Sequence, residues 1–322
     1  MLKIGNITIN SRLILAPLAG VSNLPFRLIS RKHGCKFAFT EMISARAMYY
    51  KNRNTLKMLE SNRDDTPLGV QILGDEPAIL KDSLKMLKIF PFDILDFNAA
   101  CPVGKVSSKD KGAGLLKNPA KLIEQLSVVI ENTDVPVTLK IRSGWDEGNI
   151  NAVYIAAQAE KAGAKAIFLH GRTKVQGYAG KVDYSIIKEV KKSVRIPVIA
   201  SGDNVNPQMI KKMFDETGCD AVTIARGALG NPWIFEVTEK YLKKGVLPAP
   251  PEVTEIINTM KEHLNLLKNF YGGKKGAAVF RKFFAWYSRN FKKVKSLREK
   301  SLKANTVEDM LAVIEELKVL SQ

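Results

Sequence analysis

The sequence predicts an α/β protein, a (β/α)8 TIM barrel followed by a C-terminal all-α helical domain. From about residue 12 to residue 226, eight short apolar segments alternate with helical patterns, and eight such units over about 220 residues are typical of this barrel. After a proline cluster at 248–251, only helical periodicity remains. An open doubly wound sheet is the alternative, but its first strand usually leads into a Gly-x-Gly-x-x-Gly loop. Here the first strand runs into Ala-Pro-Leu-Ala-Gly at 16–20 instead.

The predicted strands are mostly continuous apolar runs, as strands buried on both faces of a parallel sheet are. They cover residues 13–18, 37–41, 68–72, 94–98, 137–141, 166–170, 198–201 and 221–224. Helical patterns between them include residues 77–87, 119–132, 151–162 and 207–216. Proline opens three of these four helices, as it often does in a first helical turn. Gly163 and Gly218 follow two of them, where a glycine commonly ends a helix.

We expect residues 1–245 to form the catalytic barrel and residues 246–322 to form a small domain of three or four helices. The sequence Pro-Ala-Pro-Pro at 248–251 indicates a linker. Beyond it, Ile256, Ile257, Met260, Leu264 and Leu267 recur at helical spacing.

The charge of the chain is high and uneven. Its 322 residues include 50 Lys and Arg against 32 Asp and Glu, a net charge of +18, which favours an anionic partner such as nucleic acid or a membrane surface. Residues 261–303 hold 13 of the basic residues and only two acids, with aromatic residues between them. One reading is a solvated helical surface, but soluble surfaces usually mix both signs. A role in binding a phosphate backbone therefore fits better, and the predicted contacts are Arg281, Lys282, Arg289, Lys292, Lys293 and Lys295.

Other classes of protein are disfavoured. No run of about 18 apolar residues predicts a membrane span, and the first residues lack the apolar run of a signal peptide. The three cysteines are too widely spaced for a disulfide framework or a zinc site. We therefore expect a cytoplasmic monomer without a metal site or a membrane partner.

Polar residues follow most of the predicted strands, and the active site of a barrel lies at these carboxyl ends. Gly202 and the segment from Ala225 through Arg226 to Gly227 resemble a phosphate cradle, and the alternative is that the glycines serve only tight turns. Together with Gln71 and Lys140, such a cradle suits flavin mononucleotide (FMN). An amide can pair with the pyrimidine edge of the flavin, and a lysine can stabilise negative charge on the reduced ring. His170 is either a structural histidine or an anion-facing one.

Cys101 is the strongest single candidate for a catalytic residue. It follows a strand, stands next to Pro102 and precedes Lys105, whereas we interpret Cys35 and Cys219 as inert core residues. A catalytic thiol is expected to be partly exposed near cations. With an ordinary pKa near 8.5 it would be a proton donor, and with a depressed pKa it would be a nucleophile. The sequence leaves both roles open.

Six segments in order resemble the tRNA-dihydrouridine synthase family, most closely its bacterial B-type branch. They are LAPLAGVSNLPFR at 15–27, NAACPVGKV at 98–106, VTLKIR at 137–142, LHGRT at 169–173, IASGD at 199–203 and ARGALGNPW at 225–233. The resemblance covers the barrel and extends more weakly through residues 281–297. It implies an FMN enzyme that uses NADPH to reduce the C5–C6 bond of uridine in folded RNA, most often tRNA.

The resemblance also implies roles for single residues. Hydride passes from flavin N5 to C6 of the uracil, and Cys101 protonates C5. Asn98 and Arg172 match positions near the uracil and the substrate-side phosphate. Lys105 is a further expected substrate contact, because of its charge and its place after Cys101. The residues matching flavin contacts are Pro17, Leu18, Ala19, Gln71, Lys140, His170, Ser201, Gly202, Asp203, Ala225 and Arg226.

Three residues depart from the family pattern. Ala100 stands where the family usually has Gly, Ser201 where it has Asn, and Ala225 where it often has Gly. These changes leave a ribosomal RNA substrate open. Two further alternatives are a flavin reductase of a small molecule and a non-catalytic RNA-binding protein.

Overall fold

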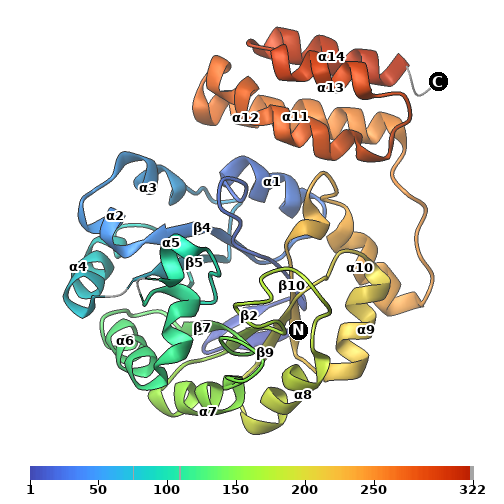
Figure 1. The fold of residues 1–322 in the computed structure, drawn as a ribbon. Helices are drawn as coiled ribbons and strands as arrows, with labels where there is room; N and C mark the ends of the chain where they lie inside the picture. The colour runs from blue at the N-terminus through green and yellow to red at the C-terminus, as the bar shows by residue number, and fades with distance from the viewer. Residues whose placement is uncertain (75, 109, 320–322) are drawn as a thin grey trace.

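The computed structural model describes residues 1–74, 76–108 and 110–319. Eight parallel strands form a closed barrel in the order β10-β3-β4-β5-β6-β7-β8-β9, and a ring of helices surrounds it (Figure 1). The predicted fold class is therefore confirmed. Of the predicted barrel, residues 75 and 109 lie outside the described residues, as do 320–322 of the predicted helical domain.

All eight predicted strands are present. They are β3 (Leu13–Leu15), β4 (Ala38–Ser44), β5 (Leu68–Leu73), β6 (Ile94–Ala99), β7 (Val137–Arg142), β8 (Ile167–His170), β9 (Val198–Ser201) and β10 (Ala221–Ile224). β3 is shorter than expected because the chain turns away at Ala16 and Pro17, and proline cannot donate to a ladder. β4 is longer than expected, because after a register shift between Phe39 and Met42 it continues to pair with β5.

Helices connect the strands outside the barrel. They are α1 (Leu24–Lys32), α2 (Ala45–Tyr49), α3 (Arg53–Met58), α4 (Pro77–Leu87), α5 (Gly104–Ser107), the 3-10 helix η1 (Gly112–Lys117), α6 (Pro119–Glu131), α7 (Ala152–Ala162), α8 (Tyr184–Ser193), α9 (Pro207–Thr217), the 3-10 turn η2 (Arg226–Ala228) and α10 (Ile234–Lys244).

Local sequence signals explain several helix ends. The side chain of Asn206 accepts a hydrogen bond from the Met209 N–H, and Pro207 occupies the first turn of α9. Gly218 ends α9 with φ +68° and Gly163 ends α7 with φ +106°. This left-handed conformation costs glycine little, which is why glycine stands at both positions.

A short hairpin, β1 (Leu2–Ile4) and β2 (Ile7–Ile9), lies at the amino ends of the barrel strands. Its Leu2, Ile4 and Ile9 are buried in one cluster with residues from the inside of the barrel, such as Phe39 and Phe168. The hairpin therefore closes the end of the barrel opposite to the predicted site. This hairpin was not predicted, although Gly5 and Asn6 between two alternating apolar stretches are a hairpin signal.

The chain after α10 leaves the barrel through residues 246–252, which form no helix or strand, and enters a bundle beside α1 (Figure 1). The bundle consists of α11 (Val253–Tyr271), α12 (Gly273–Tyr287), the 3-10 helix η3 (Ser288–Asn290), α13 (Lys295–Lys303) and α14 (Val307–Val319). Phe26 of α1 stacks on Phe283 of α12 with ring centroids 5.6 Å apart.

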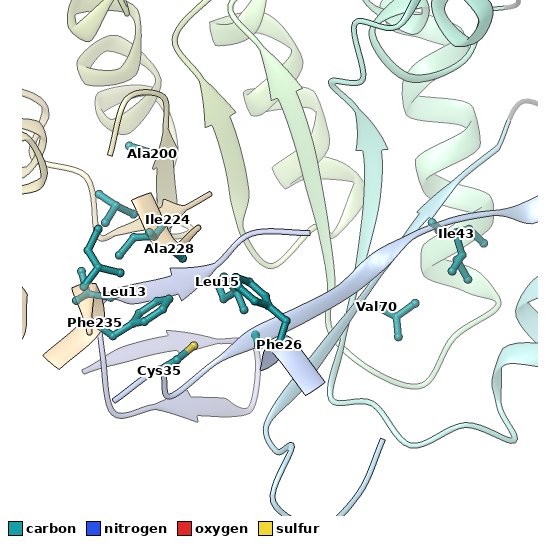
Figure 2. Close-up of a cluster of buried hydrophobic side chains, with 14 of the residues drawn as sticks. Leu13, Leu15, Phe26, Cys35, Ile43, Val70, Ala200, Ile224, Ala228 and Phe235 are labelled. Carbon is teal, nitrogen blue, oxygen red and sulfur yellow. The ribbon is translucent and has the colours of Figure 1, made fainter. Parts of the chain in front are cut away.

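The largest hydrophobic core is continuous between barrel and bundle. Figure 2 shows part of it, with Leu15, Phe26, Cys35 and Phe235 beside β3. Because buried apolar surface is the main stabilising term in folding, this shared core fixes the bundle relative to α1 and the loop before it.

Candidate active site

A cavity of about 420 Å³ opens at the carboxyl ends of the barrel strands, within the range typical of small-molecule sites. Its wall contains all eleven residues predicted to contact the cofactor, and also Asn98 and Cys101. A second, larger cavity of about 990 Å³ lies between this rim, the 247–251 segment and the bundle, and it shares Asp203, Val205 and Arg226 with the first.

Three amide and carboxyl side chains from neighbouring strands form a buried chain under the cavity. Gln71 Nε2 donates to Asp96 Oδ2 at 2.7 Å, and Asn98 Nδ2 donates to Gln71 Oε1 at 2.8 Å. The Thr138 hydroxyl donates to the other Asp96 oxygen at 2.6 Å. Burial raises the pKa of Asp96 to about 6, against its hydrogen bonds and the charge of Lys140. Both Asp96 oxygens accept hydrogen bonds, as those of an ionised carboxylate do.

Cys101 lies in the loop after β6 and is partly exposed, whereas Cys35 and Cys219 are buried. The Asn98 side-chain oxygen accepts hydrogen bonds from the Ala100 N–H at 3.1 Å and the Cys101 N–H at 2.9 Å. Arg142, itself buried, donates to the Ala100 carbonyl at 2.8 Å. The loop is thus held from two sides while the thiol lines the cavity.

Positive charge dominates the wall of the cavity. Burial lowers the pKa of His170 to about 2, with further lowering by Arg142, Lys140, Arg172 and Arg226, so this imidazole is neutral at physiological pH. Burial also lowers the pKa of Lys140, while Asp96 opposes the shift. The cavity is therefore electrostatically suited to an anionic or electron-rich ligand.

The turn after β9 carries two residues with positive φ, Gly202 at +126° and Asp203 at +51°. A side chain at Gly202 would meet Val182 at 2.7 Å, so only glycine fits this turn. The Asp203 carboxylate accepts from Arg172 and from Arg226 at 2.6 Å each. The hydrogen bond from Arg172 is the main cause that holds the pKa of Asp203 below its usual value.

The three departures from the family pattern fit the backbone. Among the described residues other than glycine, positive φ occurs at Lys51, Asp110, Asp203 and Lys293. Ala100 therefore needs no glycine conformation, and Ser201 and Ala225 both stand in the cavity wall.

The predicted substrate contacts divide into two groups. Lys105, Lys292, Lys293 and Lys295 are exposed. The other five donate to the protein itself: Asn98 donates to Gln71, and of the four cations Arg289 is exposed as well. Arg172 is buried and bonded to Asp203, Ala179 and Gly180. Arg281 caps the end of α13 at Ala304, Lys282 donates to the Gly20 carbonyl, and Arg289 donates to the Leu229 carbonyl.

The contact of Lys282 joins the bundle to the loop that carries Pro17, Leu18 and Ala19. Gly20 donates its N–H to Glu41 of β4 and accepts at its carbonyl from Lys282 of α12. Burial raises the pKa of Glu41, against the Gly20 hydrogen bond and the charge of Lys282. The bundle therefore helps to hold one wall of the cavity.

Sequence reasoning missed several residues of the site. Met42 and Tyr178 line the cavity, and Asp96 and Thr138 lie beneath it. Alternation along β6 places Asp96 on the same side as Asn98, and this was the one available signal. Tyr178 lies in an irregular loop, where no periodicity indicates direction.

The cavity wall offers unsatisfied polar atoms to a ligand. His170 Nε2, Asn204 Oδ1 and Thr223 Oγ1 are buried and have no hydrogen-bond partner among the described residues. Buried polar atoms are normally paired, so these atoms fit a polar cofactor such as FMN. No group of three His, Cys, Asp or Glu side chains in the described ranges could hold a metal ion. No helix in the part of the chain that the structure describes is long and apolar enough to span a membrane.

Comparison with known proteins identifies relatives over nearly the whole chain. The family model described as dihydrouridine synthase matches residues 14–321. The tRNA-dihydrouridine synthase B of Pseudomonas aeruginosa is 40% identical over 288 residues, which cover 89% of this chain and 86% of that protein. A probable tRNA-dihydrouridine synthase of Rickettsia conorii is 36% identical over 318 residues, covering 98% and 95%.

Solved structures share the fold at low identity. A 6-hydroxypseudooxynicotine amine oxidase from Pseudomonas geniculata N1 superposes with a TM-score of 0.60 at 12% identity, covering 80% of this chain and 52% of that one. Histamine dehydrogenase from Rhizobium sp. 4-9 gives a TM-score of 0.57 at 12% identity, covering 82% and 50%. At such identity the likeness shows the fold alone.

Proposed function

This chain belongs to the dihydrouridine synthase family, and from that premise we propose that it is a flavin-dependent oxidoreductase that reduces a uridine of tRNA to 5,6-dihydrouridine. FMN is the proposed cofactor and NADPH the proposed electron donor. One observation carries the proposal: the eleven expected flavin contacts and Cys101 line a single cavity at the active end of the barrel. Cytoplasmic location and a monomeric state stay predictions.

In this proposal the cavity wall binds the cofactor through distinct groups. The turn at Gly202 and Asp203 and the segment at Ala225 and Arg226 would hold the phosphate, since Arg226 and backbone N–H groups suit an anion. Gln71 would pair with the polar edge of the flavin ring, and Lys140 would stabilise negative charge there. Neutral His170 would add one hydrogen bond from its unpartnered Nε2.

Bound FMN would supply the hydride that adds to C6 of the uracil. The task of the protein is then to deliver a proton to C5, and Cys101 is the proposed general acid. Its thiol lines the cavity while its backbone is held by Asn98. After the thiol gives up its proton, it would recover one from solvent at the open cavity mouth.

The RNA contacts are proposed for the exposed lysines only. Lys292, Lys293 and Lys295 on the bundle and Lys105 beside Cys101 would contact phosphates. Arg172, Arg281, Lys282 and Arg289 would hold the protein framework instead, because each already donates to protein oxygens. A base in a folded RNA must leave its stack to reach the cavity.

The test uses purified protein reconstituted with FMN, NADPH and an unmodified tRNA transcript. Dihydrouridine, detected by mass spectrometry as a gain of two hydrogens, should form on the transcript and should require both FMN and NADPH. Free uridine and a ribosomal RNA transcript are the controls. Equal activity on free uridine would favour a small-molecule reductase, and preference for the ribosomal transcript would replace tRNA as substrate. Protein that binds RNA but no flavin would overturn the enzyme proposal.

A further inference from the structure

We propose that Asp96 is a positioning residue that fixes the orientation of two amide side chains, Gln71 and Asn98, and through them the loop that carries Cys101. Asp96 does not line the cavity and is 1% exposed. The inference rests on the proposed function, because that function makes Gln71 a cofactor contact and Cys101 the acid. The hydrogen-bond chain itself is a property of the folded protein alone.

Four side chains, those of Thr138, Asp96, Gln71 and Asn98, form one continuous series of hydrogen bonds. Thr138 donates to Asp96 Oδ1, and Gln71 donates to Asp96 Oδ2. Asn98 then donates to Gln71, and the Asn98 oxygen accepts from the N–H groups of Ala100 and Cys101. Strand register supports the contacts, because Gln71 pairs with Asp96 across β5 and β6, and Asp96 pairs with Thr138 across β6 and β7.

Groups that can only accept or only donate stand at both ends and agree on one direction for every bond, namely the Asp96 carboxylate at one end and the Ala100 and Cys101 N–H groups at the other. An ionised carboxylate only accepts hydrogen bonds, whereas an amide side chain has a donor end and an acceptor end. Facing Asp96, Gln71 must present its NH2 group, and its oxygen then faces Asn98. Asn98 must in turn present its own NH2 group to Gln71, which leaves its oxygen for the two loop N–H groups. A neutral amide at position 96 is not restricted to accepting, so Gln71 would then be oriented from the Asn98 side alone.

Asp96 affects the cavity in two ways, although it does not contact the cavity itself. The remaining Gln71 N–H and the remaining lone pair of its oxygen are presented in one fixed arrangement to the cofactor. The loop N–H groups of Ala100 and Cys101 are anchored at 3.1 and 2.9 Å, which sets the place of the thiol. One buried carboxylate thus coordinates the proposed cofactor site with the proposed acid.

Two readouts test this, and only one of them needs a flavin. The first is the rate of alkylation of Cys101 by iodoacetamide at pH 8 without cofactor or RNA, with the label located by mass spectrometry. Cys35 and Cys219 are buried, so Cys101 is the thiol the reagent reaches. The second is the dissociation constant of FMN, measured by its fluorescence.

Asp96→Asn keeps the shape of the side chain and removes its acceptor-only character. We expect alkylation of Cys101 to become at least threefold faster, because the Asn98 support of the loop is weakened while only the Arg142 support is unchanged, and the FMN dissociation constant to rise at least tenfold. The double variant Asp96→Asn with Gln71→Glu again allows only one arrangement of hydrogen bonds. The new carboxylate at position 71 can only accept, so the amides at positions 96 and 98 must both present their NH2 groups to it. It should return alkylation to within twofold of wild type while FMN binding stays weak.

Thr138→Val is the matched control, because it removes one bond to Asp96 without altering which end of Gln71 faces the carboxylate. It should lower the melting temperature but leave both readouts within twofold. Unchanged alkylation and FMN binding in Asp96→Asn, or alkylation in the double variant as fast as in the single one, would overturn the proposal. If Asp96→Asn does not fold, Gln71→Met cuts the same chain, and unchanged alkylation there is equally decisive. Wild-type protein that binds no FMN would refute the proposed function, while the alkylation readout would still decide on Asp96.

Discussion

Replacing Cys101 by alanine tests the proposed general acid with little disturbance of the fold. The hydrogen bonds of Cys101 in the described structure come from its backbone: the N–H donates to Asn98, and the carbonyl accepts from the Ala113 N–H at 3.1 Å. Alanine keeps both bonds. Because the side chain is only partly buried, we expect the free energy of unfolding to change by no more than about 0.5 kcal/mol.

The expected loss of activity is far larger than this change in stability. A positioned general acid contributes roughly 10²- to 10⁴-fold to a rate, which corresponds to about 3 to 5 kcal/mol in the barrier. Cys101→Ser is the matched variant, since the hydroxyl has nearly the size of the thiol but is a much weaker acid. We expect both variants to lose the same 10²- to 10⁴-fold.

The assay compares single-turnover formation of dihydrouridine in saturating tRNA with FMN affinity and tRNA affinity. Both affinities should stay within about threefold of wild type, because neither binding surface is removed. Turnover of Cys101→Ala within threefold of wild type would remove the thiol from the mechanism. A parallel loss of FMN binding would show that the residue holds the cofactor instead.

Three further predictions concern charge and protonation. Changing Lys292, Lys293 and Lys295 to Glu should weaken tRNA binding and reduce the slope of log K against log salt by roughly 2 units. The pair Lys188→Glu and Lys192→Glu on the exposed side of α8 should leave the slope unaltered, and equal effects of both sets would refute a localised RNA surface. Lys282→Met should raise the FMN dissociation constant about three- to tenfold through the Gly20 loop without changing the salt slope; the opposite pattern would make Lys282 an RNA contact. Burial lowers the pKa of His263 to about 3, so between that value and about 6.5 the unfolded chain binds a proton that the native protein does not. Stability should therefore fall as the pH drops from 8 to 5, and urea unfolding of His263→Phe should show a loss about 2 kcal/mol smaller than wild type; equal losses would contradict the assignment.

The barrel was predictable because each strand is indicated by the residues of that strand alone. Most of the strands are continuous apolar runs, and helix ends carry their own signals, such as Asn206 with Pro207 before α9 and Gly218 after it. The extension of β4 to Ser44 was not predictable, because it depends on pairing with β5 after a register shift. Such pairing involves residues far apart in the chain.

The cavity wall was predictable for a similar reason, since a barrel gathers the carboxyl ends of its strands on one rim. The chain from Asp96 through Gln71 to Asn98 was not, because it depends on which side chains of adjacent strands meet. The basic residues show the same limit. Composition located the positive segment, but only the structure shows that Lys282 faces a backbone carbonyl while Lys292 faces solvent.

The most direct test of the proposed function is one anaerobic turnover of the reduced enzyme. Enzyme with FMN is reduced by NADPH, freed of excess NADPH and mixed with unmodified tRNA, and flavin oxidation and dihydrouridine are followed together. One dihydrouridine should form for each flavin oxidised, and both processes should be slowed to the same extent in Cys101→Ala. Reduced flavin that persists in the presence of tRNA, or that is oxidised without any dihydrouridine, would contradict it.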